Sequence, residues 1–159
     1  MSDGDRNVVE LIDESVSRFG PRVLVSEASE TLDGSVLSAR DTTYADLGAQ
    51  ARKLAAGLYE NGLRPGARVA ILLENSTELV ITEWACLMSG LVWVGLNVRT
   101  SAAELQRVVD DCAPAAFLYG LRQHEPTEGL RLPRGCLRVL VAPNSADWHG
   151  VLAAGAHAV

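Results

Sequence analysis

Apolar residues recur along this chain at the spacing of a helix in four segments. Positions three and four apart carry apolar side chains there, which places them on one face of a helix. Each segment opens with a residue that can cap a helix and has an acidic residue three positions later. The predicted helices run from Asn7 to Gly20, from Thr43 to Asn61, from Asn75 to Gly90 and from Ser101 to Pro114.

Short apolar runs without polar alternation lie between these helices, at 69–73, 91–96, 115–119 and 137–141. Such runs are typical of strands that are covered on both faces. Strands that alternate with amphipathic helices predict an α/β fold, a mostly parallel sheet with helices on both faces. Trp84, in the third helix, and Trp93, in the second run, are assigned to the core.

Two weaker features complete the expected fold. Segments 22–26 and 35–39 flank a polar loop and predict a hairpin at the edge of the sheet. The stretch 122–135 combines prolines and glycines with charged residues, so we expect a surface loop with one short helical turn. The whole chain, 1–159, is expected to form one α/β subdomain.

Composition narrows the possible partners and the compartment. The formal net charge of −6 argues against nucleic acid as the main partner. No run reaches the ~18 apolar residues of a membrane helix, and the acidic, polar N-terminus is unlike a secretory signal. Cys86, Cys112 and Cys136 are odd in number and widely spaced, which fits free thiols. These features favour a cytoplasmic protein without a transmembrane segment.

Candidate ligand residues follow the strands, because open parallel sheets bind ligands beyond their carboxyl ends. Five residues are candidates there: Glu74, Asn75, Asn97, Arg99 and Asn144. Asn75 can be a helix cap or a ligand contact, and we favour the cap. Arg99 can hold an anionic ligand, or pair with Glu74 or another carboxylate to fix the loop, and we favour the pair.

Familiar catalytic patterns are missing from the sequence. Neither G-x-x-x-x-G-K-[ST] nor G-x-G-x-x-G is present, and there is no G-x-S-x-G elbow. His124, His149 and His157 have no second histidine or cysteine at ligand spacing. We therefore assign no catalytic, cofactor-binding or metal-binding residue within the chain.

Two longer blocks of the sequence resemble a known enzyme family, and this resemblance says more about function than the short motifs do. Residues 43–76, which include Thr43-Tyr44-Ala45-Asp46-Leu47 and the run up to Glu74-Asn75-Ser76, resemble the first conserved region of the adenylate-forming superfamily. Residues 85–99 are similar to that family's helix, turn, buried strand and Leu-Asn-x-Arg corner, which is more typical of its acyl- or aryl-CoA ligases. Gly95 and Val98 depart from the family, which usually has prolines at these two positions.

The resemblance implies the N-terminal part of an ATP-dependent ligase. Complete members of the family use ATP and magnesium to convert a carboxylate to an acyl-adenylate, and pass the acyl group to a thiol, often coenzyme A. The family's phosphate-binding loop and its catalytic lysine lie beyond the matching region, so no catalytic residue is carried over. We expect a fragment or split part of a fatty or aryl acid ligase that is inactive alone and whose partner is the rest of the ligase.

An alternative remains open at this point. The chain can be a stand-alone truncated paralogue that works as a non-catalytic binding or dimerisation module. Its partner would then be a second copy, a complete ligase or a carrier protein. In either role we expect the chain by itself to form a dimer, and Trp84, Leu87, Met88 and Trp93 are candidates for the dimer surface.

Overall fold

The fold is taken from a computed structural model that describes residues 7–30 and 36–156. The helices are α1 (Val8–Phe19), α2 (Tyr44–Glu60), α3 (Thr77–Met88), α4 (Ala102–Cys112), η1 (Leu121–Gln123), α5 (His124–Thr127) and α6 (Ala146–Ala156). The strands are β1 (Val23–Glu30), β2 (Val36–Thr43), β3 (Arg68–Leu72), β4 (Val92–Gly95), β5 (Ala116–Gly120) and β6 (Leu137–Val141). The predicted α/β order is confirmed, and the predicted helical turn in the loop after β5 is η1 with α5.

A four-stranded sheet with the order β4-β3-β5-β6 forms the centre of the molecule. All three neighbouring pairs are parallel, as predicted. Val69 and Ile71 of β3 belong to the larger apolar cluster, whereas Ala70 and Leu72 belong to the smaller one. Successive side chains of β3 therefore point into two different cores, as expected for a strand covered on both faces.

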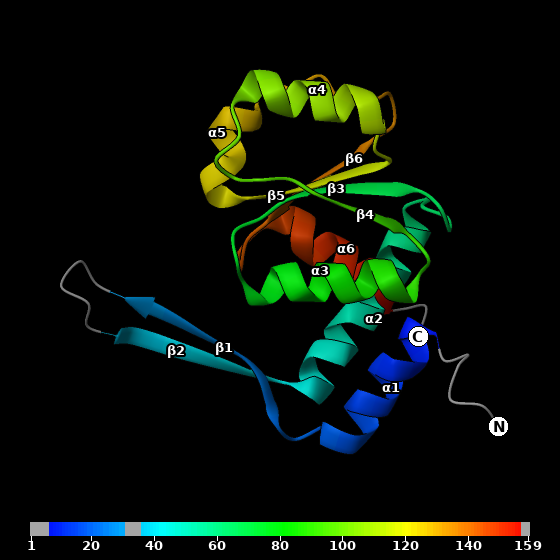
Figure 1. The fold of residues 1–159 in the computed structure, drawn as a ribbon, viewed down its shortest axis with the longest axis vertical. Coiled ribbons are helices and arrows are strands. Elements are labelled where there is room, and N and C mark those ends of the chain that lie inside the picture. Colours follow the sequence, from blue (N-terminus) through cyan, green and yellow to red (C-terminus); the bar gives the residue numbers. More distant parts are fainter. Residues whose placement is uncertain (1–6, 31–35, 157–159) are drawn as a thin grey trace.

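Helices cover both faces of this sheet (Figure 1). Residues of α2, α3 and α6 build the larger cluster on one face, and α4 packs Leu105 and Val109 against the other face. Phe117 of β5 lies in the smaller cluster and is fully buried. The prediction of a parallel sheet between two helical layers is confirmed.

Local capping explains where the helices begin. Asn7 and Glu10 form a capping box at α1, and Ser101 and Glu104 form another at α4. At α3 the prediction was one residue too early. Ser76, not Asn75, caps this helix, because its hydroxyl oxygen accepts a hydrogen bond of 3.2 Å from the backbone N–H of Leu79. Asn75 is thus not a helix cap.

Strand β4 differs from the prediction of a doubly covered strand. It is an edge strand, paired only with β3, and its residues Val92 and Trp93 are 45% and 41% exposed. The assignment of Trp93 to the core is therefore wrong, because Trp93 belongs to neither of the two apolar clusters. Trp84 is half-buried and packs against the larger cluster from α3.

The predicted hairpin exists, but it is longer than expected and separate from the main sheet. Strands β1 and β2 form a two-stranded antiparallel sheet of their own, which projects from the body in Figure 1. A carboxylate oxygen of Glu27 accepts hydrogen bonds from the backbone N–H and the hydroxyl of Thr77, at 3.2 and 2.9 Å. Arg40 bridges Glu27 and Glu78, both at 2.9 Å. Polar contacts thus attach the hairpin to the start of α3.

Helix α6 crosses α2 at two glycines. A Cβ atom on Gly57 would lie 2.0 Å from the carbonyl oxygen of Val151, and one on Gly155 would lie 1.9 Å from the carbonyl oxygen of Lys53. Neither carbonyl can move without shifting its helix backbone. The absence of both side chains is what lets the two helices approach so closely.

Candidate functional site

The loops that follow β3, β4, β5 and β6 meet at one edge, because parallel strands end on the same side of the sheet. Helix α3, which follows β3, lies on one face, whereas α4, which follows β4, lies on the other. Loops that diverge in this way leave crevices at the carboxyl ends of their strands. Two hollows open there, and both touch the end of β3.

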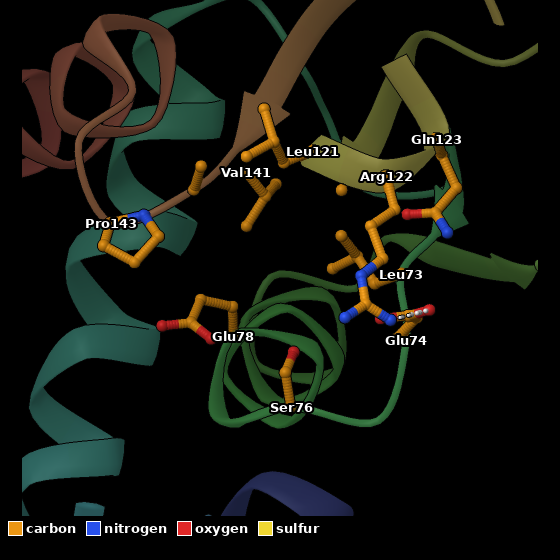
Figure 2. A pocket seen from close by; sticks show the side chains of 11 residues that line it. Leu73, Glu74, Ser76, Glu78, Leu121, Arg122, Gln123, Val141 and Pro143 are labelled. Carbon is orange, nitrogen blue, oxygen red and sulfur yellow. Dashed lines mark ion pairs between the residues drawn. The ribbon is translucent and has the colours of Figure 1, made fainter. Parts of the chain in front are cut away.

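The first hollow has a volume of about 240 Å³ and lies among the ends of β3, β5 and β6 (Figure 2). Glu74 and Arg122 form an ion pair at its rim, with 3.5 Å between Oε1 and Nη1. Ser76 and Glu78 line the α3 side, and Pro143 lines the β6 side. The side chain of Arg122 is 82% exposed, so this pair contributes little to stability.

The second hollow, of about 490 Å³, lies between the ends of β3 and β4. Its polar lining consists of Glu74, Asn75, Asn97, Arg99 and Gln123. The structure therefore brings together the first four sequence candidates, which come from two different loops. Asn144 is exposed in the loop after β6 and lines neither hollow, whereas its neighbour Pro143 lines the first.

Arg99 does not form the expected pair with Glu74. Glu74 is engaged by Arg122 instead, and among the residues that the structure describes no carboxylate forms an ion pair with Arg99. The backbone N–H of Arg99 donates a hydrogen bond of 2.9 Å to Oδ1 of Asn97, which fixes the turn that carries it. The second hollow is thus lined by a guanidinium whose charge no described carboxylate neutralises.

Two residues of this edge were missed by the sequence reasoning. Arg122 and Gln123 were placed in a surface loop, yet they lie directly beyond β5 in η1 and line the hollows. The rule that singled out the residues after the other strands also applies to the strand at 115–119. Its use there would have pointed to both residues.

Within the part of the chain that the structure describes, the edge carries no activated thiol and no histidine cluster. Cys86, Cys112 and Cys136 are free, and burial raises the pKa of Cys86 to about 12 and that of Cys136 to about 11. A thiol with so high a pKa is a poor nucleophile near neutral pH. Within residues 7–30 and 36–156, no three His, Cys, Asp or Glu side chains are grouped so that they could hold a metal ion.

None of the helices in the described ranges has both the length and the apolar character needed to cross a bilayer. Among the described residues, the carboxyl edge offers Arg99, which no described carboxylate pairs with, several amides, and Glu74, which is paired with Arg122.

Comparisons with known proteins agree with this architecture. The sequence pattern of the AMP-binding enzyme family matches residues 17–156. Feruloyl-CoA synthase of an Amycolatopsis species is 35% identical over 92 residues, which cover 58% of this chain and 19% of that protein. Tyrocidine synthase 3 of Brevibacillus parabrevis is 30% identical over 114 residues, which cover 72% of this chain and 2% of that protein.

Solved structures share the fold at low sequence identity. A long-chain-fatty-acid-CoA ligase from Archaeoglobus fulgidus superposes with a TM-score of 0.80 at 17% identity, covering 98% of this chain and 31% of that one. A benzoate CoA ligase from Burkholderia xenovorans superposes with a TM-score of 0.73 at 17% identity, covering 94% and 28%. The chain thus spans a third or less of each of these relatives. With its family pattern matched over nearly the whole length, it belongs to the AMP-binding, adenylate-forming enzyme family.

Proposed function

We propose that this chain supplies the N-terminal α/β subdomain of an ATP-dependent ligase that activates a fatty or aryl carboxylic acid and passes it to coenzyme A. The observation that carries the proposal is the carboxyl edge of the sheet. Two hollows open there beside β3, and no carboxylate in the described part of the chain pairs with the guanidinium of Arg99. The rest of the ligase is the partner that would close this edge.

The residues of the edge fit one part of the family's ligand set. A free guanidinium beside amides suits a single phosphate or carboxylate group, which it can bind with two charge-assisted hydrogen bonds. A magnesium-bound triphosphate needs more than this. It requires a phosphate-cradling loop and oxygen ligands for the metal, and the sequence lacks the common phosphate motifs. Magnesium and the triphosphate of ATP therefore belong to a complete ligase, and the chain alone is expected to be inactive.

Each polar side chain then has a defined part in recognition. Arg99 binds the anionic group of the ligand, and Asn97 holds the turn that aims Arg99. The pairing of Glu74 with Arg122 keeps a competing carboxylate away from Arg99. A ligand anion can thus bind Arg99 without breaking an existing ion pair. The free-energy cost of leaving a carboxylate without its cation is avoided.

Exchange of pyrophosphate into ATP tests the proposed inactivity. The purified chain is incubated with ATP, magnesium, labelled pyrophosphate and a panel of fatty and aryl acids. No exchange above the acid-free control is expected with any acid. Exchange that follows one acid, and that persists after a second purification, would mean that the chain contains a complete adenylation site.

Replacement of Arg99 tests the anion site. Arg99→Ala should leave the melting temperature nearly unchanged and weaken the binding of coenzyme A at least about tenfold, because a charge-assisted hydrogen bond contributes roughly 1.5–3 kcal/mol. Arg134→Ala, an exposed arginine outside both hollows, is the matched control. Equal coenzyme A binding by Arg99→Ala and the parent chain would rule out this role.

The exposed edge strand β4 favours a second candidate function, a dimerisation module. Val92 and Trp93 give it an apolar, uncharged edge that a second copy can pair with. Light scattering after size exclusion would then give about twice the 17.0 kDa of one chain. A species of 17.0 kDa at high concentration would eliminate this candidate. In either role we place the protein in the cytoplasm, where its three thiols stay reduced.

A further inference from the structure

We propose that the side-chain amide of Gln123 recognises an uncharged group of the ligand that carries a hydrogen-bond donor beside an acceptor, as amides and nucleobases do. The inference rests on the proposed function only in taking the carboxyl edge as the ligand face. Gln123 lies in η1, directly beyond β5, and lines both hollows. It stands where the two hollows meet, on the same side as the Glu74–Arg122 pair in Figure 2.

The side-chain amide of Gln123 has no hydrogen-bond partner among the described residues. The residue is only 7% exposed, yet no described residue forms a hydrogen bond with its side chain, although its backbone carbonyl accepts one from the hydroxyl of Thr127. No fully enclosed side-chain nitrogen or oxygen in the described ranges lacks a partner, so the polar atoms of Gln123 reach the hollows. Mostly buried polar groups are almost always hydrogen-bonded, either to protein or to ordered water. Water or a ligand group can supply the partner of this amide, and we assign it to the ligand.

Gly120 makes room for the amide. A Cβ atom at this position would lie 2.6 Å from Oε1 of Gln123. The backbone of Gly120 has φ −79° and ψ 166°, an extended conformation that any residue adopts. A side chain at position 120 would therefore displace the amide, which is the flexible end of Gln123, without straining the backbone.

The chemistry of the second hollow defines the ligand class. A primary amide presents one donor edge and one acceptor in a plane, so it pairs best with a group of the reverse pattern. Arg99 lines the same hollow and adds a preference for an anion. The geometry therefore favours a small anion that also carries an amide or a nucleobase.

Nuclear magnetic resonance of the intact 15N-labelled chain tests this directly, because the side-chain NH₂ of a glutamine gives its own pair of signals. The pair that belongs to Gln123 is the one absent from Gln123→Leu. Two probes distinguish the possible sources of the pattern: adenosine 5′-monophosphate for a base, and pantothenate for an amide. Ribose 5-phosphate and propionate are the matched anions without either group.

We expect the Gln123 signals to shift, to saturation, with adenosine 5′-monophosphate, with pantothenate or with both, and not with the matched anions. Gln123→Leu and Gly120→Ala should each weaken that binding by roughly fivefold, the effect of one neutral hydrogen bond. Arg99→Ala should weaken all four anions alike. If Gln123→Leu fails to fold, the probe affinity of Gly120→Ala and the shift of the side-chain NH₂ signals in the parent chain still show whether Gln123 contacts the ligand.

Gln123 signals that stay in place while both probes shift the backbone signal of Arg99 would overturn the inference, because the amide would then be bound only to water. Unchanged probe affinity in Gln123→Leu would overturn it as well. Either result leaves the proposed function intact, since that depends on the exchange assay and on Arg99. Conversely, exchange activity of the chain alone would refute the proposed inactivity and leave the role of Gln123 standing.

Discussion

Strands β4 and β5 read almost alike as sequence but occupy different environments. Both are short apolar runs, yet Ala116 to Tyr119 of β5 are all buried, whereas Val92 and Trp93 of β4 are close to half exposed. Strand β5 has a neighbour on each side and contributes residues to both apolar clusters, whereas among the described strands β4 pairs with β3 alone, and neither Val92 nor Trp93 belongs to a cluster. An apolar run therefore predicts a strand, but it does not reveal whether that strand is central or at the edge.

The comparison also separates the two candidate functions. The covered strands β3 and β5 are the rigid elements on which the carboxyl edge is built, and residues beyond both of them line the hollows. Strand β4 contributes Asn97 and Arg99 beyond its end, but its outer side remains open for pairing. The following substitutions test whether central and edge positions differ as much as their burial indicates.

The largest effect is expected from Phe117→Ala in β5. Phe117 is 0% exposed, and truncation leaves a cavity in the smaller core, so unfolding should become easier by about 3–5 kcal/mol. Urea unfolding followed by far-ultraviolet circular dichroism measures it. A loss below about 1 kcal/mol would mean that this core is loosely packed and that the contrast with β4 is weak.

Val69→Thr in β3 should have the next largest effect. The substitution keeps the shape of the side chain but buries a hydroxyl at a position that is 0% exposed. A buried hydroxyl without a good partner costs about 1–3 kcal/mol. The same urea titration checks it, and an unchanged midpoint would show that the hydroxyl finds a partner inside the core.

A smaller, pH-dependent effect is expected at the base of the hairpin. Burial opposes ionisation of Glu27, but hydrogen bonds from Thr77 and Arg40 outweigh burial and lower its pKa. The stabilisation is therefore present above the ordinary pKa of glutamate and is lost as the pH falls through the lowered value. Glu27→Gln should destabilise the protein near pH 7, and the difference should disappear once the pH falls below the lowered pKa of Glu27. Glu125→Gln, at an exposed position in α5, is the control.

Val92→Thr in β4 should have the smallest effect. Val92 lies beside Arg68 in the register of the sheet and is 45% exposed, so a hydroxyl there remains in water. The free energy of unfolding should change by less than about 0.5 kcal/mol. Together with Val69→Thr it forms a matched pair across two neighbouring strands. Equal losses at both positions would contradict the assignment of β4 as an open edge, and would indicate that a second copy covers it.

Local signals predicted the parts of the fold that depend on neighbours in sequence. The capping boxes at Asn7 and Ser101 involve residues three apart, and both are confirmed. The start of α3 was placed wrongly because Asn75 and Ser76 are both good caps. Thr77, the residue after Ser76, donates a hydrogen bond to Glu27, which lies 50 residues earlier in the sequence. A local sequence pattern cannot reveal a contact over that separation.

The candidate site shows the same limit. The position of Glu74, Asn75, Asn97 and Arg99 at one edge followed from strand ends, and they do line one hollow. The partner of Glu74 did not follow, since Arg122 reaches it from a segment beyond β5. Which of two arginines neutralises a carboxylate depends on how the loops turn after their strands. That is decided by tertiary packing.

The glycine crossing of α2 and α6 also bears on how the chain folds. The contact joins a helix that ends at Glu60 to one that begins at Ala146. The polypeptide between them must therefore lose conformational entropy before the contact between the helices can contribute to stability. Gly57 and Gly155 tolerate no misalignment, because each lies against a backbone carbonyl of the other helix. Helix α6 should therefore dock last, once the sheet has formed. In native-state hydrogen exchange, the backbone amides of α6 should show a lower free energy of opening than those of β5.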